Sequence, residues 1–326
     1  MHRFLEASGI VGTLVAALIP GMACSQTVDY PSRPVTLIVP FGAGGSTDIE
    51  ARLYAQKLTE YSGQAHLVDF KPGASTTIGS AFVAKAVPDG YTLLATNNSF
   101  TTSPALYKSL SYDPVKDFAP VSLMSKRTTV IVAYPGTPYN SIPEYIAYTR
   151  AHPGQVNLAT VGIGGNAHLN AAWFHILAKT QVTFVQYKGD AAARADLLAG
   201  RVDLTFTTLL AALPSLKSGK LKLLGIGNAE RSSMLPGALT AAEQGLAGYD
   251  ASSIFGILAP VATPAAIVTK LNADLVKAAR TPDIAAKLEA DGGLVVASTP
   301  QQFRQLIVTQ VERYRKLVQE IGITPE

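Results

Sequence analysis

Two glycine-rich segments have the residue types and spacing of an anion-binding site. Gly42–Asp48 reads GAGGSTD, and Gly162–His168 reads GIGGNAH. Each follows a run typical of a buried strand, Val35–Val39 or Val156–Thr160, and precedes a stretch with helical spacing. Glycines let the backbone approach a ligand closely, and the unpaired N–H groups at a helix start favour negative charge. We therefore expect two similar lobes that face one anionic ligand, with a chance repeat among 27 glycines as the alternative.

Residue types that carry out catalysis or hold a metal are not grouped in this way. The chain has neither a G-x-S-x-G nucleophile motif nor a phosphate-binding P-loop. His168 and His175 lie about two helical turns apart. No nearby Cys, Asp or Glu would complete a metal site with them, so ordinary packing or surface positions are favoured. We therefore predict no catalytic residue, no metal and no cofactor.

A dinucleotide-binding oxidoreductase is the alternative from a different class. The first segment follows a strand, Asp69 ends the next strand, and GIGGNA at Gly162–Ala167 fits the G-x-G-x-x-A pattern. However, Thr47 occupies the third glycine position of the first segment. The second segment also lacks an acid at the end of the strand that follows it, over residues 183–186. These departures weigh against a nucleotide cofactor.

The N-terminus has the pattern of an export signal. A short basic start precedes the apolar stretch Ile10–Ile19, which is too short to span a bilayer, and Ala23-Cys24-Ser25 is a small-residue cleavage site. We predict that residues 1–25 are a signal peptide, cleaved near Ser25/Gln26, and that the protein is periplasmic. An uncleaved anchor and a lipoprotein modified at Cys24 are the alternatives. Because Cys24 is the only cysteine, this cleavage would exclude disulfides and thiolate chemistry.

The composition is that of a globular protein with a small positive charge. Of the 326 residues, 48% are hydrophobic and 15% are charged, and the formal net charge is +4. A modest positive charge helps to attract small anions. The basic residues form no run and do not alternate with aromatic residues, so the sequence gives no support to nucleic-acid binding.

Strand and helix patterns alternate along the chain, which predicts an α/β fold with mainly parallel sheets. We expect strands over residues 35–39, 65–70, 91–95, 119–124, 129–133, 156–160, 182–187, 202–206, 221–226 and 254–258. We expect helices after each glycine segment, over residues 76–86, 143–151 and 190–198, and after the Thr-Pro pairs at 263, 281 and 299. Residues 96–99 are expected to form a polar loop. The first lobe should contain residues 26–128 and 229–326, and the second lobe residues 129–228.

Several longer stretches are similar to one protein family. They include YPSRPVTLIVPFGAGGSTDIEAR at Tyr30–Arg52, HPGQVNLATVGIGGNAHL at His152–Leu169 and FVQYKGDAAARADLLAGRVDL at Phe184–Leu204. From about Tyr30 to the C-terminus, the sequence resembles the Bug-type extracytoplasmic solute receptors of tripartite tricarboxylate transporters. The resemblance implies a two-lobed periplasmic binding protein of type II, which closes by a hinge motion on a ligand in the cleft between its lobes.

The resemblance also implies which residues bind the ligand. Backbone N–H groups of Ala43 to Ser46 would bind one carboxylate beside an apolar wall, and the second segment would bind the other end of the ligand. Asp48 is expected either to cap its helix or to hold a hydroxyl, an amine or a water. The expected ligand-binding residues are Phe41, Ala43, Gly44, Gly45, Ser46, Asp48, Asn97, Thr160, Gly162, Gly164, Gly165, Asn166, His168, Tyr187, Gly189 and Thr207.

Two residues of the second lobe depart from the family pattern. Thr207 stands where many members carry Asp, and the loss of that charge would favour a more anionic or a less polar ligand. Arg194 replaces a residue that is usually small or apolar. It is either a partner for a ligand carboxylate or a solvated arginine on a helix.

The predicted function is the capture of a small carboxylate and its delivery to an integral-membrane permease. The ligand would be a di- or tricarboxylate or an aromatic acid. We expect a monomer that is not an enzyme. A carboxylate sensor that does not support transport needs the same cleft, so it stays open as an alternative beside the dinucleotide-dependent oxidoreductase.

Overall fold

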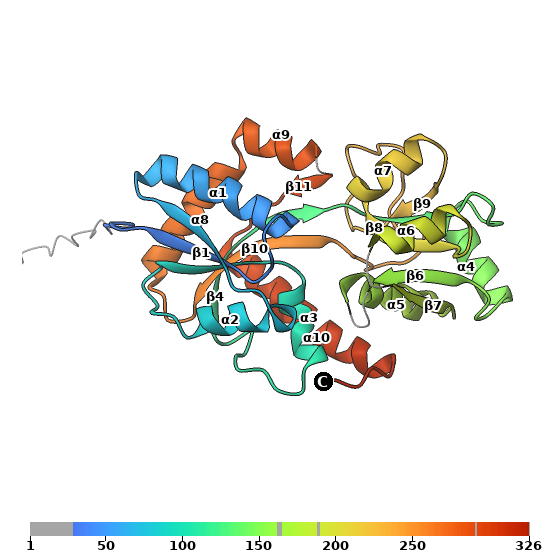
Figure 1. Cartoon of the computed structure of the whole chain (residues 1–326), viewed down its shortest axis with the longest axis horizontal. Helices are drawn as coiled ribbons and strands as arrows, with labels where there is room; N and C mark the ends of the chain where they lie inside the picture. The colour runs from blue at the N-terminus through green and yellow to red at the C-terminus, as the bar shows by residue number, and fades with distance from the viewer. Residues whose placement is uncertain (1–28, 162–164, 188–189, 291, 326) are drawn as a thin grey trace, which may run out of the picture.

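The computed structural model describes residues 29–161, 165–187, 190–290 and 292–325, so the expected signal peptide lies outside the described residues. The described chain forms two α/β lobes that lie side by side (Figure 1), each with one mixed sheet at its centre. This arrangement confirms the expected two-lobed α/β fold. The expectation of mainly parallel sheets is wrong, because five of the nine strand pairs in the described chain are antiparallel. Within these residues, no helix combines the length and the apolar character needed to cross a membrane.

The first lobe contains a six-stranded sheet with the strand order β11-β4-β10-β3-β1-β2. β1 pairs in parallel with β2 and β3, whereas β10 runs antiparallel to β3 and β4, and β11 antiparallel to β4. The bounds are β1 (Val35–Val39), β2 (His66–Phe70), β3 (Thr92–Thr96), β4 (Phe118–Arg127), β10 (Ser253–Pro260) and β11 (Gly293–Val295).

Helices cover both faces of this sheet, which explains why β1 reads as a continuous apolar run. Leu37 packs with buried residues of α1 and α8, and Ile38 packs on the other face with buried residues of α2, α3 and α10. The bounds are α1 (Ser46–Ser62), the short 3-10 turn η1 (Ala74–Thr76), α2 (Thr77–Ala84), α3 (Ser99–Leu106), α8 (Ala265–Ala279), α9 (Pro282–Ala290) and α10 (Pro300–Glu320).

The second lobe repeats this design with a five-stranded sheet of order β7-β6-β8-β5-β9. Buried residues of α4 and α5 pack in one apolar cluster, and those of α6 and α7 pack in another. The strands are β5 (Thr129–Ala133), β6 (Asn157–Val161), β7 (Thr183–Tyr187), β8 (Leu204–Thr208) and β9 (Lys222–Ile226). The helices are α4 (Ile142–Ala151), α5 (Asn166–Ala178), α6 (Asp190–Leu198) and α7 (Leu209–Lys217).

Two buried asparagines bind the chain where it passes from one sheet to the other. Between β4 and β5, the Asn228 side chain donates to the carbonyl oxygen of Arg127 (3.0 Å) and accepts from the N–H of Thr129 (2.7 Å). Asn98 binds the chain at Ser252–Ile254 in the same way, with distances of 3.1 and 2.8 Å. Each amide therefore satisfies a buried donor and a buried acceptor at a passage between the lobes.

The segment between β9 and β10 packs on the second lobe. Ala241, Leu246 and Tyr249 belong to the same buried cluster as residues of α4 and α5, and the N–H of Ala251 donates to the oxygen of Gly227 (2.8 Å). This packing favours a return of the chain to the first lobe near Ser252. The expected boundary between the lobes at residue 229 stays a prediction. We propose that this boundary lies near Ser252 instead.

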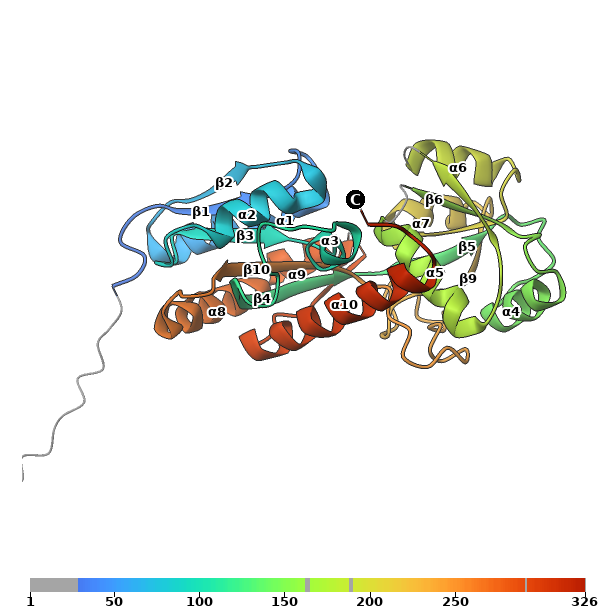
Figure 2. The ribbon, with the colours of Figure 1, turned by 90° about the horizontal axis from the view of Figure 1, so that it is seen from below.

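The helix α10 contacts both lobes (Figure 2). Its N-terminal half, including Phe303 and Ile307, packs in a core cluster of the first lobe. Its C-terminal half packs on α5, where Tyr314 and Val318 meet Leu169. The helix begins with the expected cap, because Thr299 and Gln302 form a reciprocal capping box.

Two helices lie where the sequence pattern does not predict them. α3 begins inside the expected polar loop, and α7 follows β8 directly. Each has a proline in its interior, Pro104 or Pro214, and α3 is rich in Ser and Thr, which favour turns. Buried contacts compensate, because Phe100 of α3 and Leu209 of α7 both lie in core clusters. Tertiary packing therefore overrides the local preference.

Candidate functional site

The first glycine segment forms an exposed turn that leads into α1. Gly44 has a φ of +87°, and nothing lies within 4 Å of the position that a Cβ atom would take there. The residue before the helix is Gly45, and no side chain caps the helix start. Within the described chain, the N–H groups of Gly45 and Ser46 donate to no acceptor. Free donors at a helix start are suited to an anion.

Asp48 changes the expected picture of this turn. Its carboxylate accepts the N–H of Gly44 (2.8 Å) and pairs with Nε of Arg52 (2.6 Å), and only 7% of its side chain is exposed. The expectation that every N–H group from Ala43 to Ser46 is free for a ligand is therefore wrong for Gly44. An acid in the first helical turn accepts orphan N–H groups favourably, and here it takes one from the preceding turn.

The other expected residues of the first lobe surround this turn. Phe41 is half-buried against the core of the lobe, which suits the expected apolar wall. Asn97 is held by two contacts: its amide donates to Oγ1 of Thr47 (3.3 Å), and its side-chain oxygen accepts the N–H of Ser99 (2.9 Å). Asn97 therefore stabilises the start of α3 and the start of α1.

The second segment begins α5. Gly162, Gly164 and Gly189 lie outside the described residues, while Gly165 precedes the helix without a side-chain cap. Thr160 is the next-to-last residue of β6, with 1% of its surface exposed, and its hydroxyl has no hydrogen-bond partner among the described residues. Asn166 starts α5. Like the first segment, this one lies between the end of a strand and the start of a helix.

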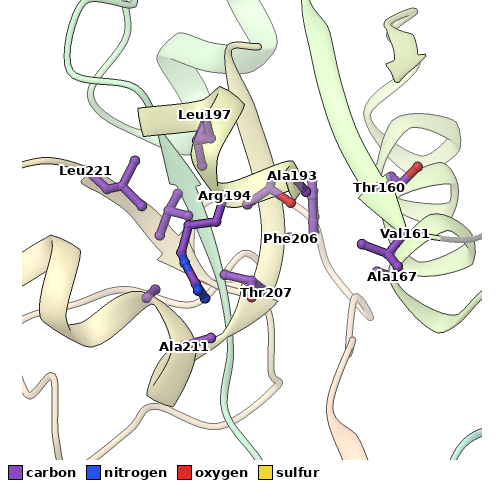
Figure 3. Close-up of a pocket in the computed structure, with 13 residues that line it drawn as sticks. Thr160, Val161, Ala167, Ala193, Arg194, Leu197, Phe206, Thr207, Ala211 and Leu221 are labelled. Atoms are coloured by element: carbon purple, nitrogen blue, oxygen red, sulfur yellow. The ribbon is translucent and has the colours of Figure 1, made fainter. Parts of the chain in front are cut away.

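Two adjoining cavities lie against this part of the second lobe. The larger has a volume of about 260 Å³, and the smaller, which reaches into the lobe, about 40 Å³. The residues common to both are Ala167, Arg194, Phe206, Thr207 and Ala211 (Figure 3). The larger cavity also contacts Thr129, Asn166, Asn170, Thr208 and Ser253, and the smaller one contacts Thr160. The volume of the larger cavity, about 260 Å³, lies just below the range of about 300 to 1,000 Å³ that is usual for ligand pockets, which suits a small ligand.

The larger cavity lies in the second lobe and reaches the sheet of the first lobe only at Ser253, the first residue of β10. Thr129 and Ser253 belong to the strands that follow the two passages of the chain, whereas Asn166 and Thr207 belong to the second lobe. Asn98, next to the expected Asn97, donates to the oxygen of Ser252. Hydrogen bonds therefore lead from the first lobe to the edge of the cavity, although the described residues of the first segment do not line it.

Two expected residues lie outside both cavities. His168 is 8% exposed and meets the ring of Phe184 edge-on at a centroid distance of 4.8 Å, and burial lowers the pKa of this histidine. Tyr187 donates its hydroxyl to Oδ2 of Asp196 (2.8 Å), which also pairs with Arg201. Partial burial and the neighbouring carboxylate raise the pKa of the Tyr187 hydroxyl. Their roles in ligand binding stay predictions.

The cavity residues that sequence reasoning missed share one property. Asn170 lies on the buried face of α5, and Thr129 and Ser253 each begin a strand after a passage between the lobes. They belong to no glycine motif, and only the fold of the second lobe, together with the position of the start of β10, places them around one space. For Thr129 and Ser253, the available sequence signal was a polar residue at the start of a strand that follows a change of sheet.

The described residues include no group of three or more His, Cys, Asp or Glu side chains that could hold a metal ion. The cavity walls instead offer hydroxyl groups, amides, backbone near a helix start and one guanidinium group. Such groups donate hydrogen bonds to oxygen atoms, so the arrangement is chemically suited to an acidic ligand.

The fold and the cavity define the class as a two-lobed solute-binding protein. The chain belongs to the tripartite tricarboxylate transporter receptors, because the family model described as "Tripartite tricarboxylate transporter family receptor" matches residues 50–323. BugT of Bordetella pertussis (strain Tohama I) is 34% identical over 316 residues, which cover 96% of this chain and 96% of BugT. Members of this family are periplasmic binding proteins for small carboxylates and work with membrane transporter components.

Two solved structures with ligands are similar to this chain. R. palustris Rpa4515 with adipate has a TM-score of 0.74 and 33% sequence identity, and the match covers 91% of this chain and 100% of that one. MatC (Rpa3494) from Rhodopseudomonas palustris with bound malate has a TM-score of 0.70 and 32% identity, over 89% and 100% of the two chains. The family expected from the sequence is confirmed.

Proposed function

We propose that this protein captures a small dicarboxylate or a related acid in the periplasm and delivers it to a membrane permease, without catalysing a reaction. The observation that carries the proposal is the cavity of about 260 Å³ in the second lobe, beside the start of β10, with walls that include hydroxyl groups, amide groups and a single arginine. Two similar proteins with bound adipate and malate support the same class of ligand.

The two glycine segments have complementary roles in the proposed mechanism. The second segment lies beside the cavity and binds one end of the ligand. Closure of the lobes then brings the free N–H groups of Gly45 and Ser46 onto the other end. The closed form is the one that the permease would recognise. The ligand contacts expected of Gly162, Gly164 and Gly189, which lie outside the described residues, belong to this proposal.

Transport can be separated from sensing by an uptake experiment. In the native host, the gene for this receptor is deleted, and the permease is expressed from an inducible promoter so that its amount no longer depends on the receptor. Uptake of labelled adipate or malate should fall to background and return when the wild-type receptor is restored. Normal uptake without the receptor would show that the protein senses its ligand instead of transporting it.

A further inference from the structure

The cavity contains one charged side chain among its described lining residues, that of Arg194. The residue lies on α6 in the described chain and lines both cavities. Figure 3 shows its guanidinium group directed toward Ala211, with Thr207 beside it. The charge therefore lies where β8 ends and α7 begins.

Several arginines of the chain are paired with acids, whereas Arg194 has no partner among the side chains that the structure describes. Arg52 pairs with Asp48, Arg127 with Glu50, and Arg201, on the turn that follows α6, pairs with Asp196. No ion pair, hydrogen bond or ring contact joins Arg194 to a residue whose side chain the structure describes; the side chains of Asp190 and Ala191 lie outside that set. A guanidinium group beside a cavity with no acid in its wall is available to a ligand.

The surroundings of this guanidinium increase the preference for an anion. α7 begins beside it, and the positive end of a helix dipole does not neutralise a cation. Thr207, at the position where an acid would compete for the arginine, is neutral. Hydroxyl groups of Thr207 and Thr208 and the amide of Asn166 are close enough to line the same space. A carboxylate there would meet a cation and several polar groups at once.

We propose that Arg194 binds a second acidic group of the ligand at the end that faces the second lobe, so that this receptor selects small diacids over monoacids and half-amides of the same length. The inference rests on the proposed function and adds a specificity residue to it. Arginine presents a planar pair of N–H donors that matches a carboxylate, whereas a neutral amide or methyl group leaves that charge without a counter-ion.

The test compares ligands that differ only at one end. Isothermal titration measures adipate, its monoamide adipamate, and hexanoate against the wild-type protein and the variants Arg194→Gln and Arg194→Lys. Arg280→Gln is the matched control, because it removes one exposed arginine from the end of α8 in the first lobe. Thermal unfolding of each variant verifies that the fold is retained.

The wild type should bind adipate at least about tenfold more tightly than adipamate or hexanoate. Arg194→Gln should weaken adipate binding about tenfold and leave adipamate nearly unchanged, Arg194→Lys should restore part of the preference, and Arg280→Gln should keep all of it. Equal losses for adipate and adipamate, or no loss in Arg194→Gln, would overturn the inference while the proposed function stands. A wild type that binds none of the three acids and not malate would overturn both.

Discussion

Asp48 illustrates how one side chain changes the number of donors that a ligand finds. Its carboxylate takes the N–H of Gly44, while the N–H groups of Gly45 and Ser46 keep no acceptor in the described chain. The first segment therefore offers fewer donors than its sequence suggests. A ligand carboxylate at this turn would lie near the Asp48 carboxylate, whose charge is partly compensated by Arg52.

Gly44→Val tests the first segment at the scale of a residue. A β-branched residue at a φ of +87° is strained by about 1 to 3 kcal/mol, and its side chain would enter the open space above the turn. We expect the affinity for adipate to fall at least about tenfold by titration calorimetry. The control is Gly63→Val at the far end of α1, where φ is +69° and the space is also open. Equal affinities in wild type and Gly44→Val would exclude the first segment from the site.

His175 gives the fold a dependence on acid pH. The ring is 5% exposed and lies within hydrogen-bonding distance of Tyr145 Oη (3.1 Å) and Thr180 Oγ1 (2.8 Å), and burial lowers its pKa from 6.5 to about 3. The folded protein therefore keeps this histidine neutral at pH values where the unfolded chain binds a proton. Burial also lowers the pKa values of His66 and His168, so these two histidines likewise reduce the stability of the folded protein as the pH falls.

The free energy of unfolding should consequently decrease as the pH falls below about 6.5, by at most about 1.4 kcal/mol per pH unit for each such histidine. Urea unfolding at several pH values between 7 and 4 measures this slope. His175→Gln should be less stable at pH 7 but should lose less stability on acidification. The same slope in the variant and the wild type would contradict the assignment.

At the scale of elements, two strand ends and two asparagines determine how the lobes are joined. Asn98 and Asn228 are 2% and 0% exposed, and each bridges the backbone on both sides of a passage. Ser253, which follows the Asn98 contact, lines the cavity. The geometry of the passage is therefore linked directly to the ligand site.

Asn98→Ala should affect both stability and binding. It leaves the oxygen of Ser252 and the N–H of Ile254 without their partner, which costs about 2 to 4 kcal/mol in the free energy of unfolding. Asn272→Ala is the control, because Asn272 also donates to two carbonyl oxygens, those of Val121 and Ser298, but only within the first lobe. Chemical unfolding should report a loss for both variants, and calorimetry a weaker affinity for Asn98→Ala alone. A weaker affinity in both would mean that destabilisation by itself impairs binding.

Elements with a strong local pattern could be predicted from the sequence. Val35–Val39 is apolar except for Thr36 because both of its faces are buried, and the capping box at Thr299 marks the start of α10. α3 and α7 could not be predicted, because Pro104 and Pro214 oppose a helix locally and only packing in the folded lobe stabilises it. Local signals suffice where they agree with the packing and fail where they conflict with it.

At the scale of the whole molecule, the same distinction applies to the site. The glycine segments indicate an anion site because their chemistry is contained in a few neighbouring residues. The cavity itself needs Thr129, Asn170 and Ser253, which come from two passages and a helix face far apart in the sequence. Their convergence depends on tertiary packing within the second lobe and on where β10 begins. The family resemblance predicted a ligand site in a cleft, which the local patterns alone do not predict.

A thermal-shift experiment on the protein purified from a periplasmic fraction tests the central claim most directly. The panel holds mono-, di- and tricarboxylates with aliphatic and aromatic chains, acidic amino acids, and NAD(P). A ligand at about 100 times its dissociation constant should add about 2.7 kcal/mol of stability, which is a shift of several degrees for a chain of this size. We expect a shift from small diacids, adipate and malate among them. A shift from NAD(P) alone would contradict the account and favour a dinucleotide-binding protein.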